Sequence, residues 1–590
     1  MHNKLSPIQA PSTTSQAPMT SLTPIQRLFR LLAAERRDIV YLYMYAALAG
    51  VISLSLPLGV QSVIGFVSSG AISTSLVVLI GLIVLGTLLV GGLQIMQLYL
   101  IEYIQQRLMA RVAFDFAVRL PRVRTEALKG EYLPELMNRL LDVPTLQKGL
   151  ATMLVDFSTA TLQILFGLTL LSFYHPIFIG FGLVLLVLLY ALIAATGPRG
   201  LRTSLAESLH KYRVVSWLED VGRTVGTFRL APRQGLVHDR TDALLNDHLG
   251  ARAAHFQVLL AQSWGFVAFK TMITAGLLSI GCWLLLDKQI NIGQFVAAEI
   301  VIITTIGAVE KLVLKLDVVY DALTSLDKIG HVLDLEPVRP ALGTAPLPLG
   351  LGTPGLDLDV RELAYRYPHA SRSILAGLSL RVAGGGHLAL AGSEGSGKTT
   401  LLRVLAGLLD GYTGQVALGN LPLPNISPVA LAQALGDNLP HQHLFSGTVL
   451  ENITLNLPTL TAADAAWAIG LVGLRDDLYA RPEGLQTRVG PGYTLGVGTT
   501  EKLLLARAIV GRPRLLLLSH LLPAVDLTER LRVLRQLLAP GLPWTLLLNT
   551  TQPELLALLP RVVVLDAGRV VADGTLAEVR DHPALSNLLG

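Results

Sequence analysis

Long apolar stretches dominate the first half of the chain and are missing from the second half. Six of them occupy residues 39–65, 72–99, 152–174, 176–197, 260–286 and 290–312. Each reaches the roughly 20 residues that a helix needs to cross a bilayer core. Short turns join them in pairs, at Ser68–Gly70, Tyr174–Pro176 and Asp287–Gln289. The pattern predicts three helical hairpins in a membrane domain that spans residues 25–335.

Basic residues indicate how these helices are oriented in the lipid bilayer. The three short turns contain a single basic residue, Lys288, whereas the N-terminal segment and both long connections are rich in Lys and Arg. Positively charged loops remain on the cytoplasmic side of a membrane. We therefore expect a multi-pass membrane protein with both termini and both long connections in the cytoplasm.

The two long connections, residues 101–150 and 198–258, have helical periodicity. We expect them to continue the membrane helices beyond the bilayer. Near their midpoints, residues 132–139 and 211–219 are each either a solvated hairpin tip or a short transverse helix that contacts a cytoplasmic domain. We favour the contact, because a second domain follows.

Three ionisable residues interrupt the apolar stretches: Lys270, Glu299 and Glu310. A charge at membrane depth costs several kcal/mol unless it is paired or faces water. Lys270 and Glu299 are expected either to form an ion pair or to line a translocation path, and the pair is favoured. Glu310 is expected at the cytoplasmic edge.

Composition narrows the possible functions and divides the chain further. Of the 590 residues, 51% are hydrophobic and 15% charged, and the net charge of +5 with no basic cluster argues against nucleic acid as a partner. The single cysteine, Cys282, rules out an internal disulfide or a cysteine-based metal cluster.

Residues 1–24 are expected to be a disordered cytoplasmic tail that is not cleaved. A Pro- and Gly-rich linker at 336–356 precedes an α/β domain at 357–590.

The sharpest motif in the α/β domain is a glycine-rich loop that begins at Gly392. Residues 392–399 fit the P-loop pattern G-x-x-x-x-G-K-[ST], between an apolar strand-like run at 387–391 and a helix-like run at 400–406. This context makes a chance match unlikely, because such a loop directs backbone N–H groups and a helix N-terminus at phosphate. Lys398 is expected to bind the β- and γ-phosphates, and Thr399 to offer its hydroxyl to Mg²⁺. The predicted nucleotide-binding residues are Tyr367, Gly392, Ser393, Gly395, Ser396, Gly397, Lys398, Thr399 and Thr400.

Tyr367 belongs to this set because it precedes the loop by about the distance at which an aromatic side chain can stack on adenine, a contact worth roughly 1–3 kcal/mol. Taken alone, a tyrosine at this position would more often be a packing residue.

The order of these features resembles that of an ABC exporter half-transporter over nearly the whole chain. Residues 444–453 read LFSGTVLENI, which is specific to exporter cassettes. Residues 505–508 resemble the end of the signature helix, 523–526 the D-loop, and 564–574 the closing strands. Residues 134–139 and 293–299 are most similar to type I secretion and peptide exporters. The resemblance implies a six-helix transmembrane domain, a P-loop nucleotide-binding domain, ATP and Mg²⁺ as ligands, and a bacterial inner or cell membrane as location.

Five motif positions depart from the family pattern. Pro440 stands where the Q-loop glutamine belongs, with Gln442 nearby, and the signature reads Gly496-Val-Gly-Thr499 after Leu495. Ser519 and His520 replace the Walker B aspartate and the catalytic glutamate, and Thr551 replaces the switch histidine. We expect weakly held Mg²⁺, because Ser519 carries no charge. The resemblance therefore leaves no catalytic position intact. A positioned base contributes about 10²–10⁴ in rate, and His520 is not expected to replace the glutamate in this role.

The family's geometry places each ATP between the P-loop of one subunit and the signature of the other. The resemblance therefore implies a dimer partner, either an intact ABC half-transporter or a second copy of this chain. The leading function is an exporter subunit that binds ATP, with impaired hydrolysis of its own and an unidentified substrate. The alternatives are an ATP-sensing membrane regulator or scaffold, and a decayed transporter.

Overall fold

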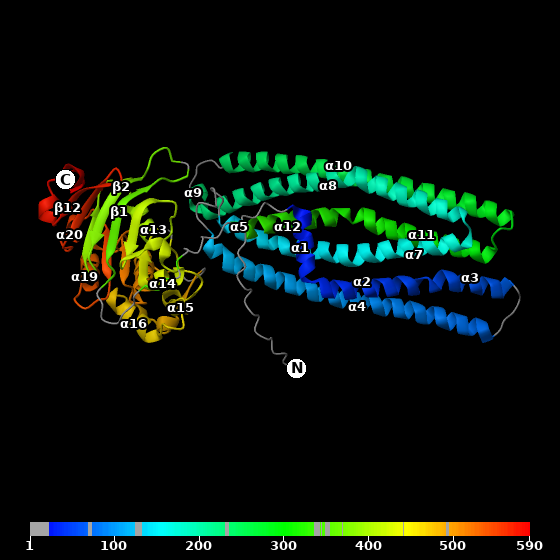
Figure 1. Cartoon of the computed structure of the whole chain (residues 1–590), viewed down its shortest axis with the longest axis horizontal. Coiled ribbons are helices and arrows are strands. Elements are labelled where there is room, and N and C mark those ends of the chain that lie inside the picture. Colours follow the sequence, from blue (N-terminus) through cyan, green and yellow to red (C-terminus); the bar gives the residue numbers. More distant parts are fainter. Residues whose placement is uncertain are drawn as a thin grey trace. The chain divides into compact units, whose positions relative to one another are not determined.

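A computed structural model of the chain describes residues 23–68, 74–123, 133–229, 235–335, 343, 345–347, 355–368, 370–440, 442–490 and 495–589. The chain divides into two compact units, Met1–Pro337 and Val338–Gly590 (Figure 1). The first is helical and the second contains both strands and helices. Residues 1–22, which are most of the predicted tail, and residues 69–73, which include the last two positions of the first short turn, lie outside the described residues.

Six helical segments in the first unit are long and apolar enough to cross a membrane, which confirms the predicted number. They are Arg36–Ser68, Thr74–Arg119, Leu136–Tyr174, Ile177–Arg223, Gly235–Leu286 and Ile292–Leu333. The longest continuous helices, α4 (Thr74–Arg119), α8 (Ile177–Arg223) and α10 (Gly235–Leu286), extend far beyond one bilayer thickness. The prediction that the long connections continue the membrane helices is therefore confirmed.

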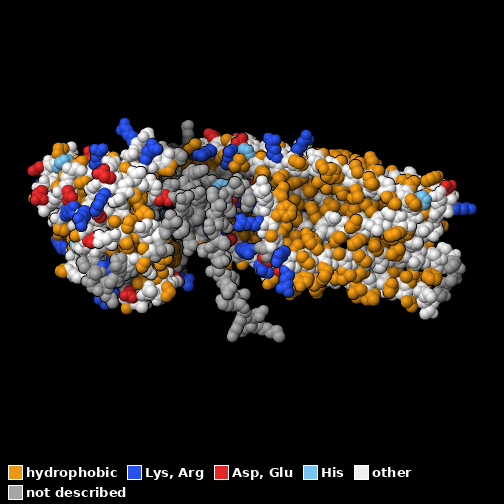
Figure 2. Space-filling view, viewed as in Figure 1, with side chains coloured by type: hydrophobic (Ala, Val, Ile, Leu, Met, Phe, Trp, Pro, Cys, Tyr) orange, Lys and Arg blue, Asp and Glu red, His pale blue; other side chains and the backbone are white. Residues whose placement is uncertain are grey.

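The surface of this unit is apolar over most of the face in Figure 2. Large hydrophobic side chains such as Val77, Leu88 and Tyr99 on α4 are exposed, at 69%, 71% and 79%. An aqueous surface would not favour so large a continuous apolar area. The exposed side chains are those expected of helices whose outer face contacts lipid.

Two helices of this unit are interrupted at sites with a physical cause. The first span divides into α2 (Arg36–Ser53) and α3 (Ser55–Ser68), because Pro57 has no N–H to donate to the carbonyl group of Ser53. The third span contains a π-helical turn, Thr152–Phe157, between α6 (Val143–Ala151) and α7 (Ser158–Tyr174). Asp156 in that turn pairs at 2.5 Å with Lys315, which lies between α11 (Ile292–Leu314) and α12 (Leu316–Leu333).

The structure corrects one of the two predicted transverse helices. Residues 133–138 form the short helix α5 (Leu133–Asn138), but residues 211–219 lie inside the continuous helix α8. The short helix on that side is α9 (Val225–Arg229), which follows α8. The sequence pattern did not distinguish α9 from residues 211–219, because both segments are helical. The two regions meet through a hydrogen bond from the Asn138 amide to Glu219.

The favoured pair between Lys270 and Glu299 is wrong. Lys270 is exposed on α10 and Glu299 is partly buried on α11, and no ion pair joins them among the described residues. Similar predicted depth on two helices does not bring two side chains within ion-pair distance, because sequence spacing leaves the rotation of each helix undefined. Glu310 is exposed.

The second unit contains an antiparallel sheet and a larger, mostly parallel sheet. The antiparallel sheet has the order β2-β1-β4-β5. Its strands are β1 (Leu358–Tyr365), β2 (Leu375–Val382), β4 (Thr413–Leu418) and β5 (Leu421–Pro422). The larger sheet has the order β12-β11-β3-β10-β9-β6. Its strands are β3 (His387–Ala391), β6 (Leu435–Asn438), β9 (Leu515–Leu518), β10 (Thr545–Asn549), β11 (Val562–Asp566) and β12 (Arg569–Gly574).

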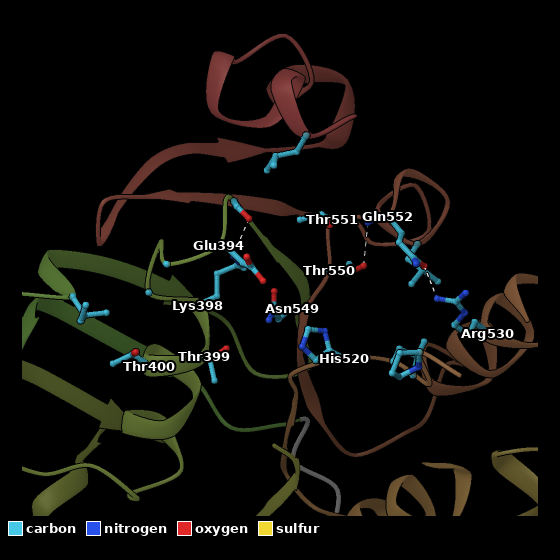
Figure 3. A pocket seen from close by; sticks show the side chains of 18 of the residues that line it. Glu394, Lys398, Thr399, Thr400, His520, Arg530, Asn549, Thr550, Thr551 and Gln552 are labelled. Carbon is cyan, nitrogen blue, oxygen red and sulfur yellow. Dashed lines mark hydrogen bonds between the residues drawn. The ribbon is translucent and has the colours of Figure 1, made fainter. Parts of the chain in front are cut away.

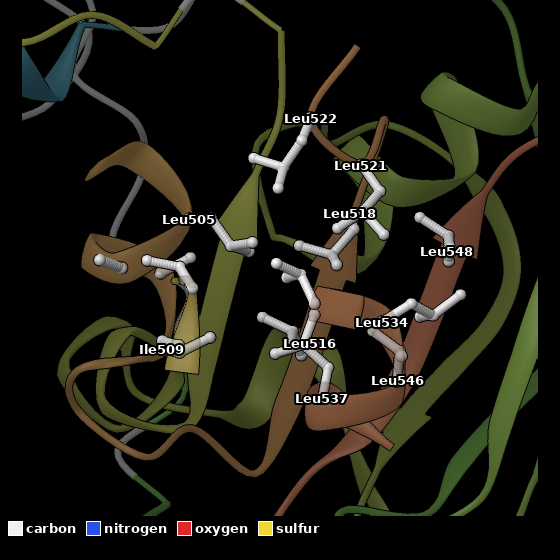
Figure 4. Packing of buried hydrophobic residues seen from close by; sticks show 14 of the residues in the cluster. Leu505, Ile509, Leu516, Leu518, Leu521, Leu522, Leu534, Leu537, Leu546 and Leu548 are labelled. Atoms are coloured by element: carbon white, nitrogen blue, oxygen red, sulfur yellow. The ribbon is translucent and has the colours of Figure 1, made fainter. Parts of the chain in front are cut away.

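The central strands of the larger sheet are covered on both faces, as parallel sheets generally are. Leu516, Leu518, Leu546 and Leu548 pack into one core cluster with α18 (Val497–Ile509) and α19 (Leu527–Leu537), part of which is shown in Figure 4. Leu515, Leu517 and Leu547 pack into the opposite cluster with α13 (Lys398–Leu405). The alternation follows from the two-residue period of a strand, and it fixes which face each following residue takes.

The predicted linker, 336–356, lies largely outside the described residues. Its described part contacts the second unit: Ala345 forms a bridge with Ile426, and Leu347 and Leu356 belong to the core cluster around α13. The end of this segment therefore packs as part of the α/β unit.

Candidate nucleotide site

A cavity of about 740 Å³ opens at the carboxyl ends of the parallel strands (Figure 3). Ligands of parallel α/β sheets bind at this edge, where loops leave the strands. The cavity brings together Tyr367, Gly392, Gly395, Gly397, Lys398, Thr399 and Thr400 from the predicted nucleotide set. Ser393 and Ser396 do not line it but hold Lys398.

The glycine-rich loop has a conformation that other residues would not adopt. Gly397 has φ +102°, and a Cβ there would lie 2.8 Å from Leu375 Cδ2 and 3.0 Å from the carbonyl oxygen of Ile374. Gly392 has φ +140° and faces the carbonyl oxygen of Leu565. Glycine at both positions lets the backbone turn tightly from β3 into α13. The loop therefore leads directly into a helix N-terminus, where backbone N–H groups are free to bind an anion.

Lys398 lies at the first turn of α13, and its ammonium group is held over the loop. Its Nζ donates to the carbonyl oxygens of Gly392 and Ser393 at 2.8 and 2.7 Å and to Ser396 Oγ at 3.1 Å. Burial lowers the pKa of Lys398 below 10.5, and nearby Glu394 partly offsets this effect. The cation is thus fixed where a phosphate chain would meet the helix N-terminus.

Tyr367 lines the same cavity, next to Thr400 in the first turn of α13. Its Oη is 3.4 Å from Thr400 Oγ1, and its ring meets that of Tyr365 edge to face, with centroids 5.0 Å apart. The ring is therefore supported by packing and also borders the cavity. This position allows a planar base to stack on it.

The residues at the replaced catalytic positions do not all reach the cavity. His520, which is exposed, and Thr551 line it. Ser519 is only 1% exposed, and its hydroxyl has no hydrogen-bond partner among the described residues. Outside the glycine-rich loop, none of the described residues that line the cavity is a carboxylate.

Gln442, the glutamine closest to the Q-loop position, points away from the cavity. Its Nε2 donates to Asp437 Oδ1 at 2.5 Å, and Gln442 is not among the lining residues. Burial raises the pKa of Asp437 above 3.8, although a hydrogen bond from the Leu439 N–H acts in the opposite direction. Asp437 therefore binds the Gln442 amide group beside β9, while Gln442 Oε1 has no hydrogen-bond partner among the described residues.

The signature-like segment leads into α18. Gly496 is the N-cap residue of that helix, and its carbonyl oxygen accepts from the Thr500 N–H at 2.9 Å. The D-loop-like segment packs against it: the Ala524 N–H donates to Glu501 at 2.9 Å. Asp526 caps α19 by accepting from the Glu529 N–H at 3.0 Å. The N-terminus of α18 is therefore a structured surface, with backbone donors and no side chain of the usual signature serine.

The exporter-type motif at 444–453 is a structural junction. Asn452 is fully buried, and its carboxamide donates to the carbonyl oxygens of Phe445 and Thr448 and accepts from the Phe445 N–H. Arg507 on α18 donates to the Asn452 carbonyl oxygen at 2.6 Å and to Asn452 Oδ1 at 2.9 Å. These bonds tie the segment after β6 to the signature-like helix.

Sequence reasoning missed four polar residues that also line the cavity: Asn549, Thr550, Gln552 and Arg530. Three of them follow the buried strand residues Leu546–Leu548 directly. The polar run after an apolar strand was a usable signal, but only the switch-histidine position was read from it. Arg530 lies on α19 and donates to Gln552 Oε1 at 2.9 Å, a contact that no sequence spacing indicates.

These residues fit a nucleoside triphosphate well and Mg²⁺ poorly. The loop, Lys398 and Tyr367 supply the groups that bind phosphate and stack on a base. Among the described lining residues, Glu394 is the only carboxylate, and it belongs to the glycine-rich loop itself. Mg²⁺ is usually held in such sites by a carboxylate in addition to the Thr hydroxyl, and Ser519 does not supply one.

Comparison with known proteins agrees with the two units. The family model "ABC transporter transmembrane region" matches residues 39–309, and the model "ABC transporter" matches residues 375–519. The solved structure of a bacterial Atm1-family ABC exporter with ATP bound superposes with a TM-score of 0.82 at 18% identity, covering 94% of this chain and 98% of that one. This likeness shows a shared fold.

Curated relatives extend the similarity over most of the sequence. The transport/processing ATP-binding protein ComA of Streptococcus pneumoniae is 24% identical over 559 residues, which cover 93% of this chain and 76% of ComA. The alpha-hemolysin translocation ATP-binding protein HlyB of Escherichia coli O157:H7 is 26% identical over 335 residues, covering 56% of this chain and 47% of HlyB. The chain is thus an ATP-binding membrane protein of the transporter class, and it belongs to the ABC exporter family as a half-transporter.

Proposed function

We propose that this exporter subunit binds ATP and transmits cassette dimerisation to its membrane helices, but hydrolyses ATP poorly by itself. The observation that carries this proposal is an intact glycine-rich loop facing a wall to which His520 and Thr551 contribute and Ser519 does not, at positions where the family has two acids and a histidine. Lys398 and Thr399 would hold the triphosphate. The described part of this wall offers no carboxylate to anchor Mg²⁺ or to polarise the attacking water.

Any robust ATP turnover then requires catalytic residues from another subunit. In a dimer with an intact half-transporter, this chain's loop would meet a complete signature but lack its own base. The partner's loop would meet Gly496 and Gly498, whose backbone N–H groups remain available at the α18 terminus. In a homodimer each site would lack the base and also meet the altered signature, whereas in the mixed dimer each site lacks only one of the two, so we favour the mixed dimer.

The membrane unit supports outward transport of a substrate whose identity this proposal leaves open. Both termini and the long helical extensions lie in the cytoplasm in this proposal, because the basic residues are concentrated there. Residues 25–335 form the transmembrane domain and 357–590 the nucleotide-binding domain, in a bacterial inner or cell membrane.

The test uses the full chain reconstituted in lipid nanodiscs. Wild type should bind ATP, whereas Lys398→Ala should lose binding, and the ATPase rates of the two should be indistinguishable. Adding an intact half-transporter should raise turnover in the wild-type mixture above that of the partner alone. Turnover by wild type alone that disappears in Lys398→Ala would refute the proposed impairment.

A further inference from the structure

A run of four polar residues, Asn549 to Gln552, begins where β10 ends, and all of them line the nucleotide cavity. They directly follow three fully buried leucines, Leu546–Leu548. Asn549 is itself only 5% exposed. In Figure 3 it lies between Lys398 and His520, at the base of the cavity. A buried carboxamide therefore borders the place where the triphosphate is expected.

Strand alternation shows which way Asn549 faces. Leu547 and Leu517 are paired across β10 and β9 and lie in the same core cluster, on the α13 side of the sheet. Asn549, the last residue of β10, is two residues further along and takes that same face, and Ser519 directly follows the end of β9. Asn549 thus stands beside the position of the missing Walker B aspartate, and unlike Ser519 it reaches the cavity.

No hydrogen bond to the Asn549 carboxamide is found in the described part of the chain, whereas its backbone pairs within the sheet. The residue is nearly enclosed, yet its amide atoms are not fully buried and remain open to the cavity, where a ligand can bond to them. An unpaired carboxamide that is nine-tenths buried and directed into a cavity is an arrangement that a polar ligand completes.

The charges around the cavity select the kind of ligand. Lys398 and Arg530 are cationic, Glu394 is the only carboxylate among the described lining residues, and the polar run is neutral. Gln552 holds the Arg530 guanidinium beside the run through a 2.9 Å hydrogen bond. An anion is therefore favoured over a cation, and the Asn549 amide can donate to it directly, a role that a carboxylate at the neighbouring strand end would not have.

We propose that Asn549 donates a hydrogen bond to the terminal phosphate of the nucleotide, and that ATP consequently binds this site without needing Mg²⁺. This inference rests on the proposed function, because it assumes that the glycine-rich loop holds ATP. The phosphate charge is met by Lys398, by Asn549 and by the more distant Arg530.

ATP affinity of the full chain in lipid nanodiscs, measured by calorimetry in excess Mg²⁺ and in EDTA, tests the proposal. Wild type should bind with dissociation constants that agree within about threefold between the two conditions. Asn549→Leu should weaken binding about tenfold or more in both, as expected for loss of a hydrogen bond to a charged group. Asn425→Leu, at an exposed position outside the cavity, is the matched control and should bind as wild type does.

Asn549→Asp provides a second variant of nearly the same shape. Its carboxylate should repel ATP in EDTA and favour the Mg²⁺ complex, so its affinity should become strongly Mg²⁺-dependent. Wild-type binding that requires Mg²⁺, or a folded Asn549→Leu variant that binds normally, would overturn the inference while leaving the proposed function standing. Absence of ATP binding by wild type in both conditions would instead overturn the proposed function, and this inference with it.

Discussion

Placing acidic side chains at positions 519 and 520 should raise ATP turnover. The perturbation is the double variant Ser519→Asp/His520→Glu, which returns the Walker B and catalytic carboxylates to their family positions. His520 lines the cavity and is exposed, so a glutamate there reaches the nucleotide without repacking. A positioned general base contributes about 10²–10⁴ in rate. We expect a gain near the lower end, about 100-fold over wild type, because Gly496–Thr499 still lack the usual signature side chains.

The same variant should also show a stability change whose sign depends on the ligand. Ser519 is 1% exposed, so an aspartate there places a carboxylate in the protein interior. An unpaired buried ion costs several kcal/mol, and the melting temperature without ligand should fall by several degrees. Mg²⁺ and ATP together should recover it, since they pair with the new carboxylate, whereas ATP in EDTA should not.

Phosphate release and thermal unfolding of the nanodisc-embedded chain measure both effects. Ser519→Asn/His520→Gln is the matched control, with side chains of the same size and no acid, and it should show neither the gain in rate nor the Mg²⁺-dependent recovery. A double variant that folds and binds ATP but turns over no faster than wild type would refute the reasoning that the lack of carboxylates in the cavity wall is what limits hydrolysis.

Three further outcomes follow from local structure. Gly397→Ala should destabilise the nucleotide-binding domain by about 1–3 kcal/mol and abolish ATP binding, because φ +102° and the Leu375 contact exclude a Cβ. Thermal unfolding measures the loss of stability, and calorimetry measures the loss of ATP binding. Asn452→Ala should cost about 1–3 kcal/mol, since it removes the buried carboxamide that bonds to Phe445, Thr448 and the Arg507 guanidinium, and a melting temperature equal to wild type would contradict the structural role of the exporter-type motif. Burial raises the pKa of Asp437, so the native state binds its proton more tightly than the unfolded chain and stability falls as pH rises from the unfolded value through the folded pKa. Asp437→Asn should therefore gain stability over wild type with rising pH, as measured by paired thermal melts at acidic and neutral pH.

The helices of the membrane half were predictable because a bilayer imposes a minimum length on the apolar segments that cross it. The six apolar stretches and their helical extensions were readable for that reason. The ion pair between Asp156 and Lys315 was not predictable, because hydropathy carries no information on which helix faces meet. Asp156 and Lys315 pair across two helix interruptions, whereas the expected partners Lys270 and Glu299 do not.

In the nucleotide-binding half, the sequence by itself determined the glycine-rich loop and predicts the positions that depart from the family motifs. These are local features: the loop's backbone conformation requires glycine at particular positions, and motif spacing places Ser519, His520 and Thr551. Only the tertiary structure decided which side chains share the cavity. It buries Ser519, turns Gln442 toward Asp437, and brings Arg530 and Asn549 to the lining, because strand register and the packing of α19 join positions that are far apart in the chain.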